Sequence, residues 1–566
     1  MPQTSPTSEK SRPVLSPAAA LKKEKGKIVS AEDAVSMIRD GDTIGTEGFL
    51  GAGFAEEIAI RIEDQFLSTG RPRDLTIVYA AGQGDGKDRG LNHLGHEGLV
   101  GRVIGGHIGL APKLQTLIRA NKVLAYNLPQ GIVTHLFRDI AAGKPGTISS
   151  VGLGTFIDPR EEGGKLNELT VTRGEDLIEL ITLRGKEYLL YKAFPIDVVL
   201  LRGTTADPDG NITMEREALT LENLSMAMAA RNSNGIVIVQ VERIAERGNL
   251  NAREVKIPGI LVDFVVVAKP ENHWQTFAET YNPSYSCEIK VPMASIPPME
   301  MSARKIIARR AAFELKPGAI VNLGIGMPEG VALVANEEKV IDYLTLTAEP
   351  GVIGGMPNSG YNFGTGTNMD CLIDQPYQFD FYDGGGLDIA YLGAAEIDRE
   401  GNVNVSKFGP RFVGPGGFIN ISQNAKNLVF VGTFTAGGLE VEVADSKLRI
   451  LQEGKEAKFV DRVLQKTFSG RHAAKANQPV LYVTERCVFS LCAEGLELIE
   501  IAPGIDLEKD ILSHMDFKPV MKSPPGLMDA RIFTEGPMGL RDELLNHSFE
   551  DLLPDSREEN ISIVSR

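Results

Sequence analysis

Apolar segments of strand length alternate with helical stretches along most of the chain. Residues 30–39 begin with a serine at the predicted N-cap, and Ala34, Val35 and Ile38 fall on one helical face. A turn, a short apolar strand and a glycine-rich loop follow at residues 40–49. This alternation predicts the α/β class, with mostly parallel sheets covered by helices.

The same order of elements returns in the second half of the chain. Residues 302–315 have the pattern of a helix, residues 319–323 that of a strand, and residues 324–330 form a second glycine-rich loop. The sequence Asp-Pro-Asp-Gly-Asn-Ile at 207–212 is echoed by Asp-Arg-Glu-Gly-Asn-Val at 398–403. We therefore expect two diverged copies of one open α/β unit, with the active site at their interface.

The proline-rich stretch around residues 296–298 marks the predicted join between the two units. The chain then divides into a tail at 1–26, domains at 27–295 and 296–525, and a C-terminal extension at 526–566. The tail is rich in Ser, Pro, Ala and Lys and lacks the apolar core of a signal peptide. We interpret it as disordered, with an organellar address as the alternative.

A single carboxylate, Glu349, follows the predicted strand at 343–347. Pro350 favours an extended conformation for the residue before it, and Gly351 permits a tight turn. The carboxylate is thereby presented at the carboxyl end of a strand, where open α/β sheets bind their ligands. Taken alone, Glu-Pro-Gly is also typical of an ordinary solvated loop.

The glycine-rich loop at 324–328, Gly-Ile-Gly-Met-Pro, lies between a predicted strand and a predicted helix. In that context backbone N–H groups can bind an oxyanion or a phosphate. The loop does not match the spacing of the dinucleotide fingerprint and lacks the Lys-Ser/Thr ending of a P-loop. The sequence therefore argues against a nicotinamide cofactor.

Composition narrows the classes of function. A formal net charge of −16 opposes binding to nucleic acid or to an anionic membrane. The longest apolar runs, at 235–241 and 261–268, fall well short of the roughly 20 residues that a membrane-spanning helix needs. Four cysteines without a Cys-x-x-Cys pair predict reduced thiols and a cytoplasmic protein.

Two other groups could carry chemistry. His93 and His96 have a spacing that could hold a metal, but we prefer loop packing and hydrogen bonding and propose no metal. Glu47, in the first glycine-rich loop, is the rival nucleophile. In the repeat, however, it corresponds to the second domain's glycine-rich loop and not to Glu349.

From about residue 27 to residue 525, the order of these motifs resembles that of the family I CoA-transferases. The segments that carry the resemblance are Pro-Gln-Gly at 129–131, Gly-Ile-Gly-Met-Pro at 324–328, Glu-Pro-Gly at 349–351, Phe-Tyr-Asp-Gly-Gly-Gly-Leu-Asp-Ile at 381–389, Gly-Asn-Val-Asn-Val-Ser at 401–406, Gly-Gly-Phe-Ile-Asn-Ile at 416–421 and residues 498–506. Within the family, the chain looks like the single-chain propionate or acetate CoA-transferases. The resemblance implies two duplicated α/β domains of the CoA-transferase type.

The resemblance also implies roles for particular residues. Glu349 falls on the family's nucleophile, Gln130 on its first-domain amide and Gly385 on the glycine near the thioester. The loop that binds CoA and the oxyanion falls on Gly324, Ile325, Gly326, Met327 and Pro328, and a further CoA contact falls on Asn368. Pro350 departs from the family's pattern, which leaves the local loop geometry open.

The implied reaction exchanges CoA between a short-chain acyl-CoA and a free carboxylate, through a glutamyl-CoA thioester. At pH 7 a glutamate of ordinary pKa, about 4.3, is already ionised and needs no histidine base to act as a nucleophile. CoA is then substrate and covalent intermediate, with no permanently bound cofactor.

Alternatives remain at this point: an acyl-CoA hydrolase on the same site, or a CoA- or metabolite-binding protein without catalysis. The resemblance further implies a homotetramer or homodimer.

Overall fold

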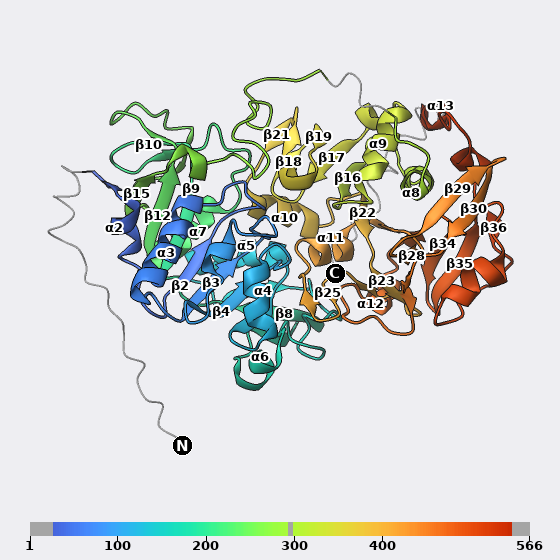
Figure 1. The fold of residues 1–566 in the computed structure, drawn as a ribbon, viewed down its shortest axis with the longest axis horizontal. Coiled ribbons are helices and arrows are strands. Elements are labelled where there is room, and N and C mark those ends of the chain that lie inside the picture. The colour runs from blue at the N-terminus through green and yellow to red at the C-terminus, as the bar shows by residue number, and fades with distance from the viewer. Residues whose placement is uncertain (1–25, 293–297, 546–566) are drawn as a thin grey trace.

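The computed structural model describes residues 26–292 and 298–545. Figure 1 shows two α/β domains side by side, the first coloured blue to green and the second yellow to red. Residues 1–25 of the predicted tail and most of the predicted join lie outside the described residues. Within the described ranges, no helix is both long and apolar enough to cross a membrane.

The first domain is built on a sheet of eight strands in the order β1-β15-β12-β9-β2-β3-β4-β5. Every neighbouring pair in it is parallel. The strands are β1 (Ile28–Val29), β2 (Thr43–Thr46), β3 (Leu75–Tyr79), β4 (Val100–Gly105), β5 (Leu124–Asn127), β9 (Val198–Arg202), β12 (Ile236–Val241) and β15 (Phe264–Val267). Strands such as β9 are buried along their whole length, as expected for parallel strands covered on both faces.

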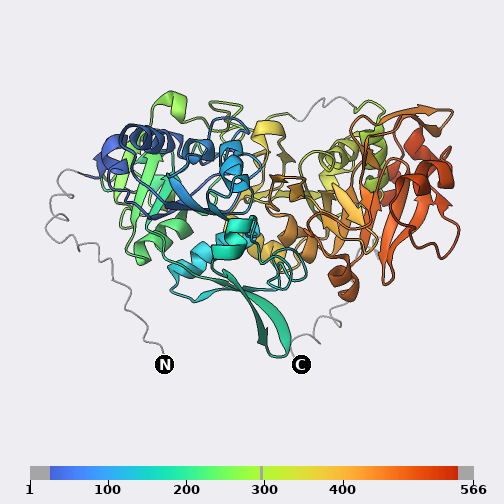
Figure 2. The ribbon, with the colours of Figure 1, turned by 60° about the horizontal axis from the view of Figure 1, so that its bottom comes forward.

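Helices and two smaller sheets complete this domain. The helices are α2 (Ala31–Val35), α3 (Glu56–Thr69), α4 (Pro112–Arg119), α5 (Gln130–Ala141), α6 (Glu168–Arg173) and α7 (Asn223–Asn232). The smaller sheets contain β6 (Gly146–Ser149), β7 (Ile178–Leu183) and β8 (Lys186–Lys192), and β10 (Thr205–Ala206), β11 (Ile212–Thr213), β13 (Arg243–Ile244) and β14 (Val255–Ile257). Figure 2 shows the β7–β8 hairpin projecting from the body of the molecule.

The second domain contains a sheet of ten strands in the order β21-β18-β17-β16-β22-β27-β33-β34-β35-β36. Its central strands, β17 to β33 in this order, are parallel. The strands are β16 (Ile320–Leu323), β17 (Thr345–Ala348), β18 (Val352–Ile353), β21 (Cys371–Leu372), β22 (Ile389–Gly393), β27 (Asn427–Val431), β33 (Val480–Val483), β34 (Cys487–Cys492), β35 (Gly495–Ile501) and β36 (Gly526–Leu527). The helices are α8 (Ala303–Ala312), α9 (Glu329–Glu337), α10 (Gln375–Asp383), α11 (Phe418–Asn424), α12 (Gly470–Lys475) and α13 (Leu540–Leu545).

The predicted helix and strand are both present, but their first or last residues differ from the prediction. Ser30 caps α2 by accepting a hydrogen bond from the Asp33 N–H (3.0 Å), but the helix ends four residues before the predicted Arg39. The predicted strand at 343–347 starts two residues later, because Tyr343 ends a short 3₁₀ helix at Ile341–Tyr343. Glu349 still follows the last residue of β17 directly.

The predicted duplication is visible in one repeated turn. Asp207 Oδ1 accepts hydrogen bonds from the N–H groups two and four residues further on, at 3.0 Å each. Asp398 does the same in the second domain, at 3.0 and 3.1 Å. In both copies the asparagine four residues on also donates its side-chain amide to the aspartate, at 2.9 Å. Two diverged copies of one unit are therefore confirmed.

The segment after residue 525 is not separate from the second domain. Its strand β36 pairs with β35 in the main sheet. Arg309, only 1% exposed, donates to main-chain carbonyls of this segment, among them Thr534 at 2.6 Å. The Glu338 carboxylate accepts from the N–H groups of Met538, Gly539 and Leu540 at 2.6–3.1 Å. Residues 526–545 are thus fastened to the domain by a buried cation and a buried anion.

Candidate active site

Glu349 and the glycine-rich loop lie at the same edge of the second sheet. Strands β16 and β17 are parallel, with Asn322 opposite Thr347. Continuing this register places Gly324 and Glu349, which follow the two strands, next to each other at the carboxyl edge. The prediction that the carboxylate is presented at a strand's carboxyl end is confirmed.

The first domain reaches this edge through the start of α5. The Gln130 N–H donates to the Gly416 carbonyl at 2.9 Å, and the Gly416 N–H donates to the Gly106 carbonyl at 2.9 Å. The Gly131 N–H donates to Asn420 Oδ1 at 3.2 Å, at the start of α11. Helix α5 therefore joins the second domain where the candidate nucleophile lies, as the predicted interface site requires.

A glycine that the sequence analysis left without a role lies against the carboxylate. A Cβ atom placed on Gly417 would be 2.7 Å from Glu349 Oε2. Gly417 belongs to the Gly-Gly-Phe-Ile-Asn-Ile segment that contributed to the resemblance. The signal for its role was a glycine pair directly before a helix, where a main chain can approach a ligand or carboxylate closely.

Glu349 is half-buried beside an apolar cluster that spans both domains. This interdomain apolar cluster consists of Phe49, Ala52, Ala81, Ala218, Leu219, Leu221 and Tyr285 from the first half of the chain and Ala348, Val352 and Met369 from the second. Burial raises the pKa of Glu349 to about 7, and the Gln130 amide acts in the opposite direction. The expectation of an ordinary carboxyl pKa is therefore wrong.

The Gln130 side chain is 2% exposed. Its Nε2 makes no hydrogen bond of ordinary geometry to any described residue, although the amide is close enough to lower the pKa of Glu349. A buried, unpaired amide donor is costly unless a ligand or water completes it. Its position beside Glu349 is suited to donating a hydrogen bond to an oxyanion that develops there.

Gly385 does not lie near Glu349. It occupies the turn between α10 and β22, with φ +85°, and its N–H donates to the Tyr382 carbonyl at 3.0 Å. Because it precedes a parallel strand while Glu349 follows one, the two residues lie at opposite edges of the sheet. The expectation of Gly385 beside a thioester is wrong, and Gly417 takes that position.

The predicted CoA loop is open on its outer side. Ile325 is 57% exposed, and Gly326 has φ +86° with no atom within 4 Å of where its Cβ would stand. Gly324 donates its N–H to the Tyr391 carbonyl (2.9 Å), the Gly330 N–H donates to Met327 (3.1 Å), and Pro328 is buried. The loop therefore has a fixed base and a free outer surface, which suits contact with a ligand.

The side-chain amide of Asn368 is already hydrogen-bonded at both ends. Its Oδ1 accepts from the Val291 N–H (2.8 Å), and its Nδ2 donates to the Val291 carbonyl (2.7 Å). With both ends of the amide used, the side chain braces the segment between the domains. The expected CoA contact at Asn368 is not supported by this arrangement.

The candidates for a rival nucleophile and for a metal site have structural roles instead. Glu47 is fully buried, and burial together with Glu222 raises its pKa well above the ordinary range, which disfavours the carboxylate form that a nucleophile needs. His93 bridges Glu63 and Glu56 at 2.5 and 2.9 Å, and His96 contacts Glu63 at 2.6 Å. Over the described ranges, no group of side chains is arranged to hold a metal ion.

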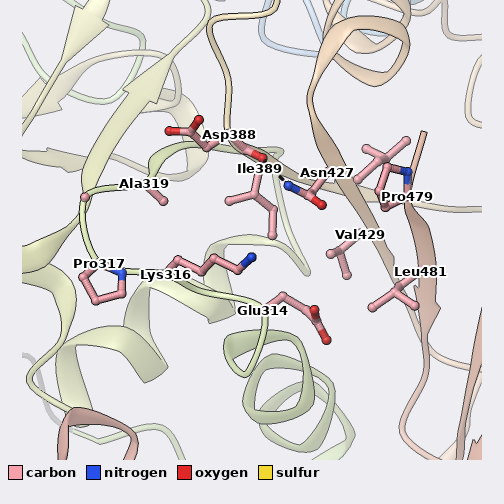
Figure 3. A pocket seen from close by; sticks show the side chains of 12 residues that line it. Glu314, Lys316, Pro317, Ala319, Asp388, Ile389, Asn427, Val429, Pro479 and Leu481 are labelled. Atoms are coloured by element: carbon pink, nitrogen blue, oxygen red, sulfur yellow. Dashed lines mark hydrogen bonds between the residues drawn. The ribbon is translucent and has the colours of Figure 1, made fainter. Parts of the chain in front are cut away.

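A cavity of about 420 Å³ lies elsewhere in the second domain. Figure 3 shows its lining, in which Ala319, Asp388, Asn427 and Pro479 stand at or just before the first residues of β16, β22, β27 and β33. The cavity is therefore at the amino edge of the sheet, opposite Glu349. Ligands of open α/β sheets bind at the carboxyl edge, so this cavity is not the active site.

Comparison with known proteins agrees with this geometry. The coenzyme A transferase family model matches residues 28–268. Caffeate CoA-transferase from Acetobacterium woodii is 49% identical, over 90% of this chain and 98% of that protein. Acetate CoA-transferase YdiF from Escherichia coli O157:H7 is 44% identical, over 90% and 96%. A crystal structure of the acyl-CoA transferase YdiF from E. coli O157:H7, a thioester complex with CoA, superposes with a TM-score of 0.85 at 43% identity, over 91% and 98%.

These relatives cover both domains, whereas the family model covers the first. The similarity therefore includes the half of the chain that carries Glu349. The chain belongs to the coenzyme A transferase family, among the family I enzymes whose two α/β domains share one polypeptide.

Proposed function

We propose that this CoA-transferase moves CoA between a short-chain acyl-CoA and a free carboxylate, with Glu349 as its nucleophile. The observation that carries the proposal is the position of that carboxylate. It stands at the carboxyl edge of a parallel sheet, over Gly417 and beside the buried Gln130 amide of the other domain. The YdiF protein was crystallised as a thioester complex with CoA, which fits a covalent intermediate.

The first half-reaction has two steps. A Glu349 carboxylate oxygen attacks the thioester carbonyl of the acyl-CoA, and the C–S bond breaks to give an acyl-glutamyl anhydride and CoA thiolate. The thiolate then attacks the glutamyl carbonyl, which releases the first carboxylate and leaves a glutamyl-CoA thioester. A second carboxylate reverses both steps and leaves as the new acyl-CoA.

Each step passes through a tetrahedral oxyanion that needs hydrogen-bond donors. We assign Gln130 Nε2 as one donor, because it is buried beside Glu349 without a regular partner among the described residues. Losing one such donor typically lowers the rate about 100- to 1,000-fold. The outer surface of residues 324–328 supplies the contact with CoA, through main-chain groups that a glycine leaves accessible.

Besides stabilisation of the oxyanion, the reaction requires that water be excluded, and the interdomain apolar cluster meets this requirement. Phe49 and Leu221 from the first domain pack with Val352 and Met369 from the second, next to the main chain of Glu349. A covalent thioester in such surroundings is protected from hydrolysis. The same apolar wall favours an uncharged acyl group.

We further propose that the protein works as a homodimer or homotetramer without a permanently bound cofactor. Light scattering on the purified protein would test the first part of this proposal, and mass spectrometry under native conditions would test both parts.

The central test is to incubate the purified protein with acetyl-CoA or propionyl-CoA without an acceptor, then to search for CoA on the Glu349 peptide by mass spectrometry. We expect an adduct that acetate discharges and that Glu349→Ala cannot form. Steady release of CoA without an adduct would favour the hydrolase, and no reaction with a panel that includes aromatic acyl-CoAs would refute the proposal. The panel is informative because relatives are named for acetate and for caffeate.

A further inference from the structure

Helix α10 buries a partly polar face against the site. Gln375, Gln378, Phe379 and Tyr382 are spaced to lie on one side of the helix, and all four are 0% exposed. Two of them bind each other, since Gln378 Nε2 donates to Tyr382 Oη at 2.8 Å. Burying a hydroxyl and an amide is costly unless they are hydrogen-bonded, so their partners show what this face holds in place.

Those partners are the last two residues of β17, together with Asn322 of β16, whose Nδ2 donates to Tyr382 Oη at 3.3 Å. Tyr382 Oη donates to Thr347 Oγ1 at 2.8 Å, and Gln378 Nε2 donates to the Ala348 carbonyl at 3.3 Å. Thr347 Oγ1 in turn donates to a main-chain carbonyl of β16, at 3.0 Å. Glu349 is the next residue, so this network fixes the strand end from which the carboxylate projects.

The same helix also contacts the other parts of the site. A Cβ on Gly131, next to Gln130, would be 2.5 Å from Phe379 Cδ1, and a Cβ on Gly417 would be 3.2 Å from Phe379 Cζ. Phe379 stands edge-on to Tyr382, with ring centroids 5.9 Å apart. One helix face therefore contacts the end of β17, the glycine under the carboxylate and the start of α5.

We propose that Tyr382 is a positioning residue for Glu349, acting through Thr347 and Gln378 to hold the end of β17 in register with Gln130 and Gly417. The inference rests on the proposed role of Glu349 as nucleophile. Tyr382 itself does not touch the reacting atoms. Its hydroxyl sets the direction of the strand end, and a carboxylate displaced by about 1 Å can lose a factor of about 100 in rate.

The test compares Tyr382→Phe with Tyr482→Phe. Tyr482 is a matched control for the loss of a buried hydroxyl, because the residue is 1% exposed and its hydroxyl donates a hydrogen bond to the main-chain carbonyl of Gly401 at 2.6 Å, away from β17. In single-turnover reactions with propionyl-CoA, we expect Tyr382→Phe to form the Glu349 adduct about 10- to 100-fold more slowly. The half-saturating acyl-CoA concentration should stay within about threefold, and Tyr482→Phe should react at the parent rate.

Thr347→Val provides a second variant, since it removes the acceptor of the Tyr382 hydroxyl and keeps the side-chain volume. The double variant should slow the reaction by less than the product of the two single effects, because both changes break the bond between Tyr382 and Thr347. Hydrogen exchange of the peptide spanning 345–351 should accelerate in Tyr382→Phe and not in Tyr482→Phe.

Adduct formation at the parent rate by Tyr382→Phe, or equal slowing by Tyr482→Phe, would overturn the inference. A parent protein that forms no adduct on Glu349 would instead refute the proposed nucleophile. In that case the exchange rate of residues 345–351 still decides whether Tyr382 holds the strand end.

Discussion

The raised pKa of Glu349 predicts an acid limb in the first half-reaction. Only the carboxylate form attacks a thioester, so the rate of adduct formation should follow the ionised fraction of Glu349. Burial is the main cause of the raised pKa, and the Gln130 amide lowers it in part. Changing the pH of the reaction mixture is therefore the direct perturbation, and it requires no mutation.

The magnitude follows from a pKa of about 7. The ionised fraction is then about 0.9 at pH 8, about 0.1 at pH 6 and about 0.01 at pH 5, so the rate should fall roughly 90-fold between pH 8 and pH 5. An ordinary carboxyl pKa would give less than a twofold change over the same range. In free energy, raising the pKa from 4.5 to about 7 corresponds to roughly 3 kcal/mol in favour of the neutral form.

The assay is rapid-quench formation of the Glu349–CoA adduct at propionyl-CoA concentrations well below saturation, where the rate follows the pKa of the free protein. Circular dichroism at each pH checks that the protein stays folded. Gln130→Met serves as the second perturbation. Because the amide lowers the pKa of Glu349, its loss should move the midpoint to higher pH. It should also lower the plateau rate, since an oxyanion donor is lost.

A profile that stays flat from pH 8 to pH 5.5 would refute the reasoning, because the carboxylate would then titrate as a solvated group. A downward shift of the midpoint in Gln130→Met would show that the amide does not face the carboxylate as described.

Three further outcomes are expected. Gly417→Ala places a Cβ 2.7 Å from Glu349 Oε2 and should slow adduct formation about 100-fold. In the control Gly526→Ala, the nearest atom to the new Cβ is 3.7 Å away, and the rate should not change. Equal rates for the two variants would contradict the contact between Gly417 and Glu349. A chain ending at residue 525 leaves Arg309 and Glu338 buried without these partners and should lose about 3–5 kcal/mol of unfolding free energy in urea; a truncated chain as stable as the full chain would contradict this account. Burial acts to lower the pKa of His93, but Glu56 and Glu63 outweigh it and raise the pKa. The imidazolium therefore stabilises the fold fully below the pKa of the unfolded protein, about 6.5, and less as the pH rises through the pKa of the folded protein. His93→Gln should lower the free energy of unfolding more at pH 6 than at pH 9. Equal losses at the two pH values would contradict this account.

The sequence alone was sufficient to predict features that depend only on residues close together along the chain. Glu349 and the loop at 324–328 each follow a strand, and their meeting at one edge needs only that the strands are parallel. The repeated Asp-x-x-x-Asn turns could be recognised because each turn is completed within five residues. These predictions needed no knowledge of which residues far apart in the chain come together.

Gly385 shows where such reasoning failed and how it could have succeeded. The glycines at 384–386 come before the apolar run that begins at Ile389, and a loop before a parallel strand lies at the edge away from the ligands. Gly417 comes before a helix instead. Its contact with Glu349 depends on how the 413–417 loop is fastened to the first domain, which no local pattern reports. The pKa of Glu349 depends on the same long-range burial.

The site reconciles two opposing demands on one carboxylate. Protection of a thioester from water requires the interdomain apolar cluster beside Glu349, and this burial stabilises the neutral acid, which cannot attack. Gln130 relieves part of the conflict, because an amide donor stabilises the ionised carboxylate and then remains in place for the oxyanion that forms. The donor comes from the first domain and the nucleophile from the second, so the balance is set when the domains pack together through α5 and α10. A change at that interface should therefore alter the reactivity of Glu349 even where it leaves each domain folded.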